Sequence, residues 1–319
     1  MSEELKASAF PLLALDIGGT KVGWAIISLV GEELLVTESG SIPTLALEGG
    51  AEVASRICEL VASTSSSFPE IKGVAVASAG VVDPRVGKIV SATNTMPGWG
   101  GTDLGDLLRE ASGRPVWILN DVHAHGLGEA RLGAGVGHDT VLSVAVGTGI
   151  GGALIHDGEV VFGSHNLAGH LGHIHHHFAP EMLCSCGRMG HIEAFCSGSG
   201  ITAWYEARRS TQDPKALNGR RLQELADSGH PLAAACFTES AYALGEALGS
   251  LANCVDPAII VLSGSMTRSG EAWWASLREG YRASAMNAVA DLEIVAGSLG
   301  SNAPLLGAVI HYLNQIASS

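Results

Sequence analysis

The feature of this sequence that most constrains its fold is a repeated plan of strand, glycine-rich turn, strand, hairpin turn and strand. The first copy spans Phe10–Ser39 and the second spans Thr140–Phe162. Short apolar runs bounded by glycine turns are typical of buried strands. Two copies of one plan in a chain of 319 residues predict two similar α/β domains that face each other.

Further apolar runs follow each copy. They predict helices at Ala51–Ser65 and Glu239–Val255, and buried strands at Gly73–Ala79, Val116–Leu119 and Ala258–Ser263. From this order we expect a smaller N-terminal α/β domain made of residues 1–121 and about 301–319. A larger C-terminal α/β domain, residues 122–300, should carry a metal-binding cysteine pair.

Composition and charge exclude several classes of function. A hydrophobic content of 46% with 42 glycines fits a globular α/β protein. The formal charge of −14 argues against a nucleic-acid partner, because phosphate backbones require a basic surface. The polar, acidic N-terminus lacks a signal sequence, and no apolar run reaches the roughly 18 residues that span a membrane. We therefore expect a cytoplasmic protein that does not bind membranes.

The two glycine turns are candidate phosphate-binding elements. The first is Asp16-Ile17-Gly18-Gly19-Thr20-Lys21 and the second is Gly147-Thr148-Gly149. Glycines let backbone N–H groups approach an anion closely, and threonine hydroxyls add hydrogen-bond donors. Asp16, at a strand end, can hold Mg²⁺ through water. Either turn alone could be an ordinary hairpin; the matching pair predicts a clamp for nucleotide phosphates.

A dinucleotide-binding interpretation of the second turn fails. Gly147, Gly149 and Gly152 match the G-x-G-x-x-G pattern, which has meaning only when a helix follows. Here the strand-like run Ala153–His156 follows instead. An NAD-dependent enzyme is therefore disfavoured.

Motifs along the whole chain resemble the ROK family of sugar kinases and repressors. The resemblance is carried by Leu15–Lys21, Val146–Gly152, Asn94–Trp99, Leu119–Asp121, Gly169–Glu193, Asp256–Gly264 and Leu299–Gly307, in the family's order. It implies a two-domain actin-like ATPase (ribonuclease H-like) fold with the sugar site in the interdomain cleft. It also implies ATP with Mg²⁺, a small-molecule sugar, and a homodimer.

The resemblance assigns roles to individual residues. Asp121 is the expected general base, and Gly264 lies in the adenosine-side motif. Sugar contacts are expected from Asn94, Asn120, Asp121, His170, His173 and Glu193. Two alternatives stay open: an Asn-Asp pair also caps helices, and Glu193 could be an acid at a helix N-terminus.

The metal site implied by the family is altered in this chain. His173, Cys184, Cys186 and His191 are ligand types that closed, tetrahedral zinc sites use. The family normally has a cysteine at the position of His191, so we expect a structural Cys2His2 zinc site. The neighbouring tract His175-His176-His177 is expected to be exposed and solvated.

A second departure bears on the sugar. The run Ala168-Gly-His170-Leu-Gly-His173 has histidine where most family kinases have glutamate near the sugar C2 position. A neutral imidazole can donate or accept a hydrogen bond and suits an acetamido group. The run resembles bacterial N-acetylmannosamine kinases, which implies ATP-dependent phosphorylation of that sugar at the 6-hydroxyl. The alternatives are a glucokinase or glucomannokinase, and a non-catalytic sugar sensor.

Overall fold

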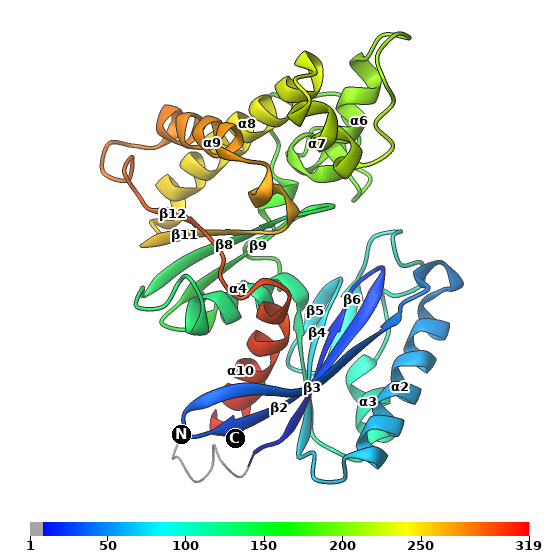
Figure 1. Ribbon diagram of the computed structural model, residues 1–319. Coiled ribbons are helices and arrows are strands. Elements are labelled where there is room, and N and C mark those ends of the chain that lie inside the picture. The colour runs from blue at the N-terminus through cyan, green and yellow to red at the C-terminus, as the bar shows by residue number, and fades with distance from the viewer. Residues whose placement is uncertain (1–8, 319) are drawn as a thin grey trace. The chain divides into compact units, whose positions relative to one another are not determined.

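The computed structural model describes residues 9–318, and its two main sheets repeat one strand order (Figure 1). The orders are β3-β2-β1-β4-β7 and β10-β9-β8-β11-β12. In the first sheet β2 is antiparallel to β1, whereas β4 and β7 run parallel to β1. In the second sheet β9 is antiparallel to β8, whereas β11 and β12 run parallel to β8. The expected duplication is confirmed, and the repeated topology is that of the actin-like ATPase fold.

The strand bounds follow most of the expected apolar runs, but β3 extends to Pro43, beyond the expected Ser39, and β9 begins at Ile150, before the expected Ala153. The first sheet comprises β1 (Leu12–Ile17), β2 (Lys21–Val30), β3 (Glu33–Pro43), β4 (Gly73–Ser78) and β7 (Val116–Asn120). The second comprises β8 (Thr140–Val146), β9 (Ile150–His156), β10 (Glu159–Val160), β11 (Ile259–Ser263) and β12 (Ile294–Ala296). A small separate hairpin pairs β5 (Val81–Asp83) with β6 (Lys88–Ser91).

Helices follow the strands in both halves. The α-helices are α2 (Gly50–Ser67), α3 (Leu104–Ser112), α4 (Asp121–Leu132), α5 (Glu193–Cys196), α6 (Gly198–Arg208), α7 (Gly219–Asp227), α8 (Pro231–Val255), α9 (Glu271–Ser284) and α10 (Ala303–Ser318). The short 3-10 helices are η1 (Ala46–Glu48), η2 (Leu171–His173), η3 (Ser265–Arg268) and η4 (Gly300–Asn302). None of the described helices is both long and apolar enough to cross a bilayer.

The chain divides into two compact units. Unit 1 contains the described chain up to Gly133, together with Glu159–Ala168 and the C-terminal segment from Ser301. Unit 2 contains Ala134–Gly158 and Gly169–Gly300. Helix α4 belongs to unit 1, although the boundary expected from the sequence preceded it, because α4 packs against α10.

Each unit has its own apolar core. In unit 1, Val53, Ile57 and Val61 of α2 recur every four residues, so they lie on one helix face and are fully buried. In Figure 1, α2 and α3 lie on one side of the first sheet and α10 lies on the other. Helix α10 is buried continuously from Ala303 to Leu313, which fits its contacts with β1, β4, β7 and α4.

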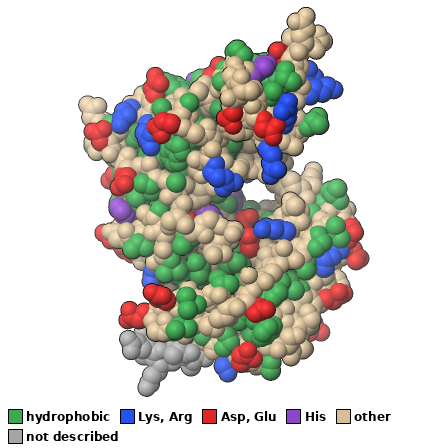
Figure 2. Space-filling view, in the orientation of Figure 1, with side chains coloured by type: hydrophobic (Ala, Val, Ile, Leu, Met, Phe, Trp, Pro, Cys, Tyr) green, Lys and Arg blue, Asp and Glu red, His purple; other side chains and the backbone are tan. Residues whose placement is uncertain are grey.

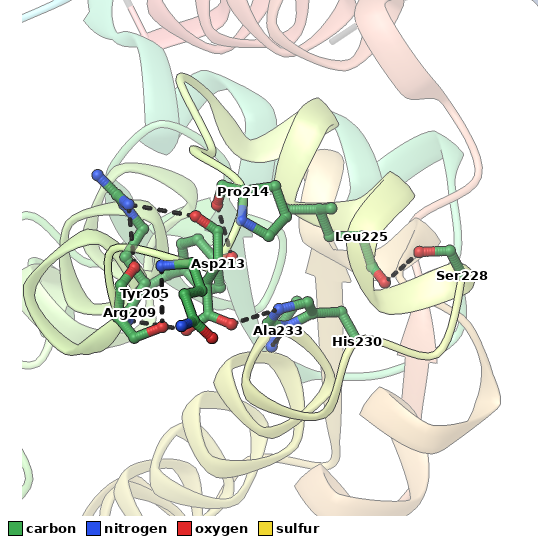
Figure 3. Close-up of polar contacts among 10 residues, drawn as sticks. Tyr205, Arg209, Asp213, Pro214, Leu225, Ser228, His230 and Ala233 are labelled. Carbon is green, nitrogen blue, oxygen red and sulfur yellow. Dashed lines mark hydrogen bonds and ion pairs between the residues drawn. The ribbon is translucent and has the colours of Figure 1, made fainter.

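Helix α8 of unit 2 begins earlier than the sequence indicated. We expected its start at Glu239, whereas the helix begins at Pro231 with His230 as its N-cap. Figure 3 shows His230 beside Asp213 and Ala233: Nε2 lies 3.2 Å from Asp213 Oδ1, and Ala233 N–H donates to Nδ1 at 3.4 Å. Proline at the first helical position has no N–H to leave unpaired, so the His-Pro pair starts the helix.

Charge is distributed broadly over the surface. On the face in Figure 2, acidic side chains are spread over both units and are interspersed with Lys and Arg. This distribution accompanies the formal charge of −14.

The close packing of α10 on α4 predicts a sharp penalty for one added methyl group. A Cβ at Gly307 would lie 1.7 Å from Ala124 O, so Gly307→Ala should destabilise the protein by about 1–3 kcal/mol. The matched control is Gly219→Ala, also helical, where the nearest atom would be 3.8 Å away. Urea unfolding midpoints measure the difference. Equal midpoints for the two variants would contradict the packing argument.

Candidate active site

The first glycine turn is an exposed loop held by a buried threonine. Gly18 N–H donates to Lys21 O at 3.1 Å, which closes the turn between β1 and β2. Thr44 is fully buried; its hydroxyl donates to Gly18 O at 2.6 Å and its N–H donates to Thr20 O at 3.1 Å. The turn is therefore fixed from below, while Gly19, Thr20 and Lys21 face solvent. Such a turn can present backbone and hydroxyl donors to an anion.

Asp16 lies at the end of β1, directly before this turn. Burial and the nearby carboxylate of Asp121 together raise the pKa of its carboxyl from 3.8 to about 6, against the opposing effect of Lys21. Two neighbouring carboxylates, each with a raised pKa, favour binding of a cation that offsets their charge. The sequence-predicted Asp16 and Asp121 are thus electrostatically coupled within unit 1.

Asn120 and Asp121 form the junction of β7 and α4. Asn120 Oδ1 accepts from His123 N–H at 3.1 Å, which caps the helix. Its Nδ2 donates to Gly80 O at 2.8 Å and to Asp121 Oδ1 at 2.9 Å. Asn120 is buried, and its amide holds the Asp121 carboxylate in place. The capping alternative is therefore what the structure contains; a sugar contact of Asn120 stays a prediction.

The carboxyl of Asp121 occupies the first position of α4. Burial raises its pKa above the usual 3.8, and hydrogen bonds from Val122 N–H and the Asn120 amide oppose the shift. A raised carboxyl pKa brings a general base closer to neutral pH, where proton transfer is most effective. The geometry gives Asp121 one engaged oxygen, Oδ1, on which the Val122 and Asn120 bonds converge.

Asn94 lies in an exposed loop that is anchored to the same turn as Asn120. Trp99 is fully buried, and its indole Nε1–H donates to Ala79 O at 3.0 Å. Gly80, the next residue, accepts from Asn120. One turn, Ala79–Gly80, therefore positions the Asn94 loop and the Asn120–Asp121 junction together.

In unit 2 the second glycine turn lies against the N-terminus of α6. Gly147 N–H donates to Gly149 O at 2.9 Å, and Gly198 N–H donates to Gly147 O at 2.8 Å. Gly264 follows β11 with φ of 94°, and a Cβ there would lie 2.4 Å from Val146 O. Only glycine fits so close to the end of β8 with positive φ. The structure thus brings the second turn and Gly264 together; β9 follows the turn, so the dinucleotide motif is excluded.

Glu193 links the second turn to the cysteine loop. It begins α5 and is buried at 9% relative exposure. Its Oε2 accepts from Ile150 N–H at 3.0 Å; its Oε1 accepts from the Ser185 hydroxyl at 2.5 Å and the Cys184 thiol at 3.3 Å. Both oxygens are therefore engaged within unit 2.

The four sequence-predicted metal ligands converge. Ligand atoms of His173, Cys184, Cys186 and His191 all lie within 4.8 Å of one another. Cys184 Sγ is 3.4 Å from His173 Nδ1, and Cys186 Sγ is 3.2 Å from His191 Nδ1. Sulfur and nitrogen ligands of a tetrahedral zinc lie about 3.5 Å apart, given bonds of about 2.3 and 2.0–2.1 Å. The donor set therefore fits zinc.

Protonation governs whether this set can bind a cation. Burial, together with the Glu193 carboxylate, raises the pKa of the Cys184 thiol to about 12. Zinc binds the thiolate, so binding must displace this proton and must weaken as pH falls.

His170 precedes the cluster at the start of η2. It is half-buried and lies three residues before His173, so the altered position and the cluster share one short loop. The neighbouring His175–His177 tract differs from expectation. His177 is exposed, but His176 is buried at 9%, and its ring stacks with the rings of both His177 and Phe178. The expectation that all three are solvated is wrong for His176.

The chain is similar to known proteins over most of its length. The ROK family model matches residues 12–315. The chain belongs to the ROK family. It is 30% identical to a glucokinase of Halalkalibacterium halodurans, with 92% of each chain covered. It is 29% identical to an N-acetylmannosamine kinase of Yersinia pestis, covering 80% of this chain and 82% of that one. A ROK glucokinase of Streptomyces griseus, solved with glucose and AMPPNP, has a TM-score of 0.80 at 27% identity and covers 95% of this chain and 99% of that one.

Sequence reasoning missed the residues that support the site from beneath. The buried Thr44 holds the first turn, the Ala79 carbonyl holds the Asn94 loop, and the exposed Ser185 donates to Glu193. A single threonine, serine or alanine has no distinctive spacing, so no local pattern could have indicated them.

The raised pKa of Asp16 predicts a stability cost for its charge. A folded-state pKa of about 6 against 3.8 means that the ionised group destabilises the fold above pH 6, and the cost vanishes below pH 4. Asp16→Asn should therefore raise the free energy of unfolding by about 1–3 kcal/mol at pH 7.5 and have little effect at pH 4. Urea unfolding at both pH values measures this.

The control has the opposite sign. Hydrogen bonds from Arg85 lower the pKa of Asp83, so Asp83→Asn should lose stability at pH 7.5 and not at low pH. A destabilising effect of Asp16→Asn at pH 7.5 would refute the buried-charge interpretation.

Proposed function

We propose that this ROK-family chain is an ATP-dependent sugar kinase that phosphorylates the 6-hydroxyl of N-acetylmannosamine. The observation that carries the kinase assignment is the Asp121 carboxylate, buried with a raised pKa at the start of α4 beside Asp16. Family membership and the glucokinase and N-acetylmannosamine kinase relatives support it. A cytoplasmic location, where ATP is available, fits this activity.

Asp121 acts as the general base. Its carboxylate accepts the proton of the attacking hydroxyl as the phosphoryl group is transferred. Asn120 is a positioning residue, because its amide donates to Asp121 Oδ1 and fixes the carboxylate direction. Most of the remaining catalysis is orientation and charge stabilisation.

The nucleotide side uses the glycine turns. In unit 1, Gly18, Gly19, Thr20 and Lys21 offer exposed donors, and Asp16 would hold Mg²⁺. In unit 2, Gly147, Thr148 and Gly149 offer the matching turn, and Gly264 lets the chain after β11 approach closely. When bound, Mg²⁺ offsets the negative charge that accumulates on the transferring phosphoryl group.

Sugar hydroxyls are contacted by Asn94, His170, His173 and Glu193 in this proposal. The Asn94 loop is exposed and anchored through Trp99. Glu193 engages Ile150 and Ser185 but keeps lone pairs for a hydroxyl, since a carboxylate offers about four acceptor sites. His173 serves the loop mainly as a metal ligand.

A structural zinc ion is proposed at His173, Cys184, Cys186 and His191. The convergence of their ligand atoms supports it. Four protein ligands leave no open position, so the ion would fix the loop that carries His170 and not activate water.

The N-acetylated substrate rests on His170, where most of the family's kinases carry glutamate. An imidazole beside C2 removes a negative charge and can donate to the acetamido oxygen. Glucose is the second candidate, because the glucokinase of Halalkalibacterium halodurans matches over more of the chain than the N-acetylmannosamine kinase does.

The proposal predicts turnover that depends on Asp121. ADP release with N-acetylmannosamine should fall about 10²–10⁴-fold in Asp121→Asn, while sugar binding by calorimetry stays within a few-fold of wild type. Asp106→Asn, an exposed carboxylate on α3, should retain full turnover.

Other sugars separate the alternatives. The panel includes N-acetylglucosamine, N-acetylgalactosamine, glucose and mannose. Binding without turnover of any sugar would identify a sensor and refute the kinase. Turnover of glucose far above N-acetylmannosamine would refute only the acetamido proposal.

The role of His170 predicts a shift of preference. His170→Glu should raise the ratio of kcat/KM for glucose over N-acetylmannosamine by at least about tenfold, which corresponds to roughly 1.4 kcal/mol of transition-state discrimination. His165→Glu, an exposed histidine with the same charge change, should leave the ratio unaltered. An unchanged ratio in His170→Glu would show that C2 is recognised elsewhere.

A further inference from the structure

A second group of metal-ligand side chains lies in unit 2, apart from the cysteine cluster. It comprises His176, His177 and Glu246, whose ligand atoms all lie within 4.8 Å of one another. Glu246 Oε2 is 3.8 Å from His176 Nε2 and 3.6 Å from His177 Nε2. One carboxylate oxygen therefore faces the Nε2 atoms of two adjacent imidazoles.

One oxygen of the Glu246 carboxylate lacks the hydrogen bonds that a buried charge needs. Glu246 lies on α8, whose only other acidic residue is Glu239, and its side chain is 19% exposed. Its Oε2 atom is buried and has no hydrogen-bond partner. Burial of a carboxylate oxygen without a hydrogen-bond partner is unfavourable, more so than burial of a neutral polar group. A cation at this point would remove that cost.

His176 does not supply the compensation by ionising. Burial, with the neighbouring His177 and His175, lowers the pKa of His176 to about 4, so its imidazole is neutral at pH 7. Neutral imidazole is the form that binds metals. His176 and Glu246 are therefore close together, but they do not form an ion pair at pH 7.

The rings are held in place before any ion binds. His176 and His177 stack with centroids 4.6 Å apart, and His176 also stacks on Phe178 at 5.8 Å. Phe178 packs in turn on the buried Phe195. Phe178 N–H lies 3.5 Å from His176 Nδ1, at the outer limit of a hydrogen bond, and this contact is given up when Nε2 binds a metal.

We propose that His176, His177 and Glu246 bind a divalent transition-metal ion, with Zn²⁺ as the best fit. Two imidazoles and one carboxylate are the protein ligands of open zinc sites, and imidazole ligands disfavour Mg²⁺ and Ca²⁺. Nitrogen and oxygen ligands of a tetrahedral zinc lie about 3.3 Å apart. The observed 3.6 and 3.8 Å need only small side-chain movements to close around the ion.

The ion would have a mechanical effect on the cysteine loop. His176 N–H donates to Gly190 O at 2.9 Å, and His175 pairs with His191 in a β-bridge, so the histidine tract and the cysteine loop are joined. A metal held also by Glu246 ties this loop to α8. Three protein ligands leave a coordination position for water, which the exposed His177 keeps accessible.

The test uses full-length protein stripped with a chelator and then titrated with Zn²⁺ or Co²⁺. Wild type should bind two equivalents, and Glu246→Gln and His177→Asn should each bind one. Co²⁺ distinguishes the sites, because only the cysteine cluster gives thiolate-to-cobalt charge-transfer absorption. In Cys184→Ser/Cys186→Ser, the remaining equivalent should bind without that absorption and should raise the melting temperature.

The matched control is His156→Asn. His156 Nε2 lies 3.5 Å from Asp157 Oδ2, an exposed histidine–carboxylate pair without a third ligand, so its loss should leave the stoichiometry at two. In Glu246→Gln and His177→Asn the second equivalent should bind at least about tenfold more weakly, so that it stays unfilled at concentrations that fill it in wild type. A wild type that binds only one equivalent with thiolate-to-cobalt absorption, or an affinity unchanged in both Glu246→Gln and His177→Asn, would overturn the proposal. Sugar-kinase turnover plays no part in either outcome.

Discussion

The side-chain amide of Asn120 is the contact on which the unit 1 half of the site depends. Its oxygen caps α4 through His123 N–H, and its nitrogen donates both to Gly80 O and to Asp121 Oδ1. No carboxylate or hydroxyl can make this set, because two donated protons and one accepted proton are needed at fixed angles. The helix start and the direction of the Asp121 carboxylate are thereby fixed by one buried group.

In unit 2, the acidic side chain of Glu193 has a role similar to that of Asn120 in unit 1. Glu193 accepts from Ile150 N–H at the start of β9 and from Ser185 and Cys184 in the cysteine loop. The turn and the loop therefore cannot move independently. In both units, an exposed functional loop is held by a buried polar group whose own hydrogen bonds are satisfied, which is how polar side chains are tolerated inside a core.

The sequence predicted the sheets well because their information is local. Apolar runs with glycine turns indicated β1, β4, β8 and β11 within a few residues, and the repeated plan indicated the duplication. Contacts between distant segments were not predictable in this way. The burial of His176 depends on Phe178 and on Glu246 of α8, far along the chain, so a run of three histidines looked solvated.

The sequence predicted which residue types make up the candidate site, but it did not predict the hydrogen-bond partners of those residues. Motif order predicted roles for Asp16, Asp121 and the four cysteine-cluster ligands, and the structure brings the last four together. It did not reveal that Asn120 and Glu193 use their polar atoms internally. Spacing indicates which chemical groups are present, whereas hydrogen bonding among them depends on backbone placement that spacing does not encode.

The packing of α10 has a consequence for synthesis of the chain. This helix, Ala303–Ser318, covers one face of a sheet whose first strand is Leu12–Ile17. Unit 1 therefore cannot complete its core on the ribosome until those last residues have emerged, although unit 2 lies wholly before them. The first half of the protein to be made is the last to finish folding, and its apolar sheet face needs protection in the interval.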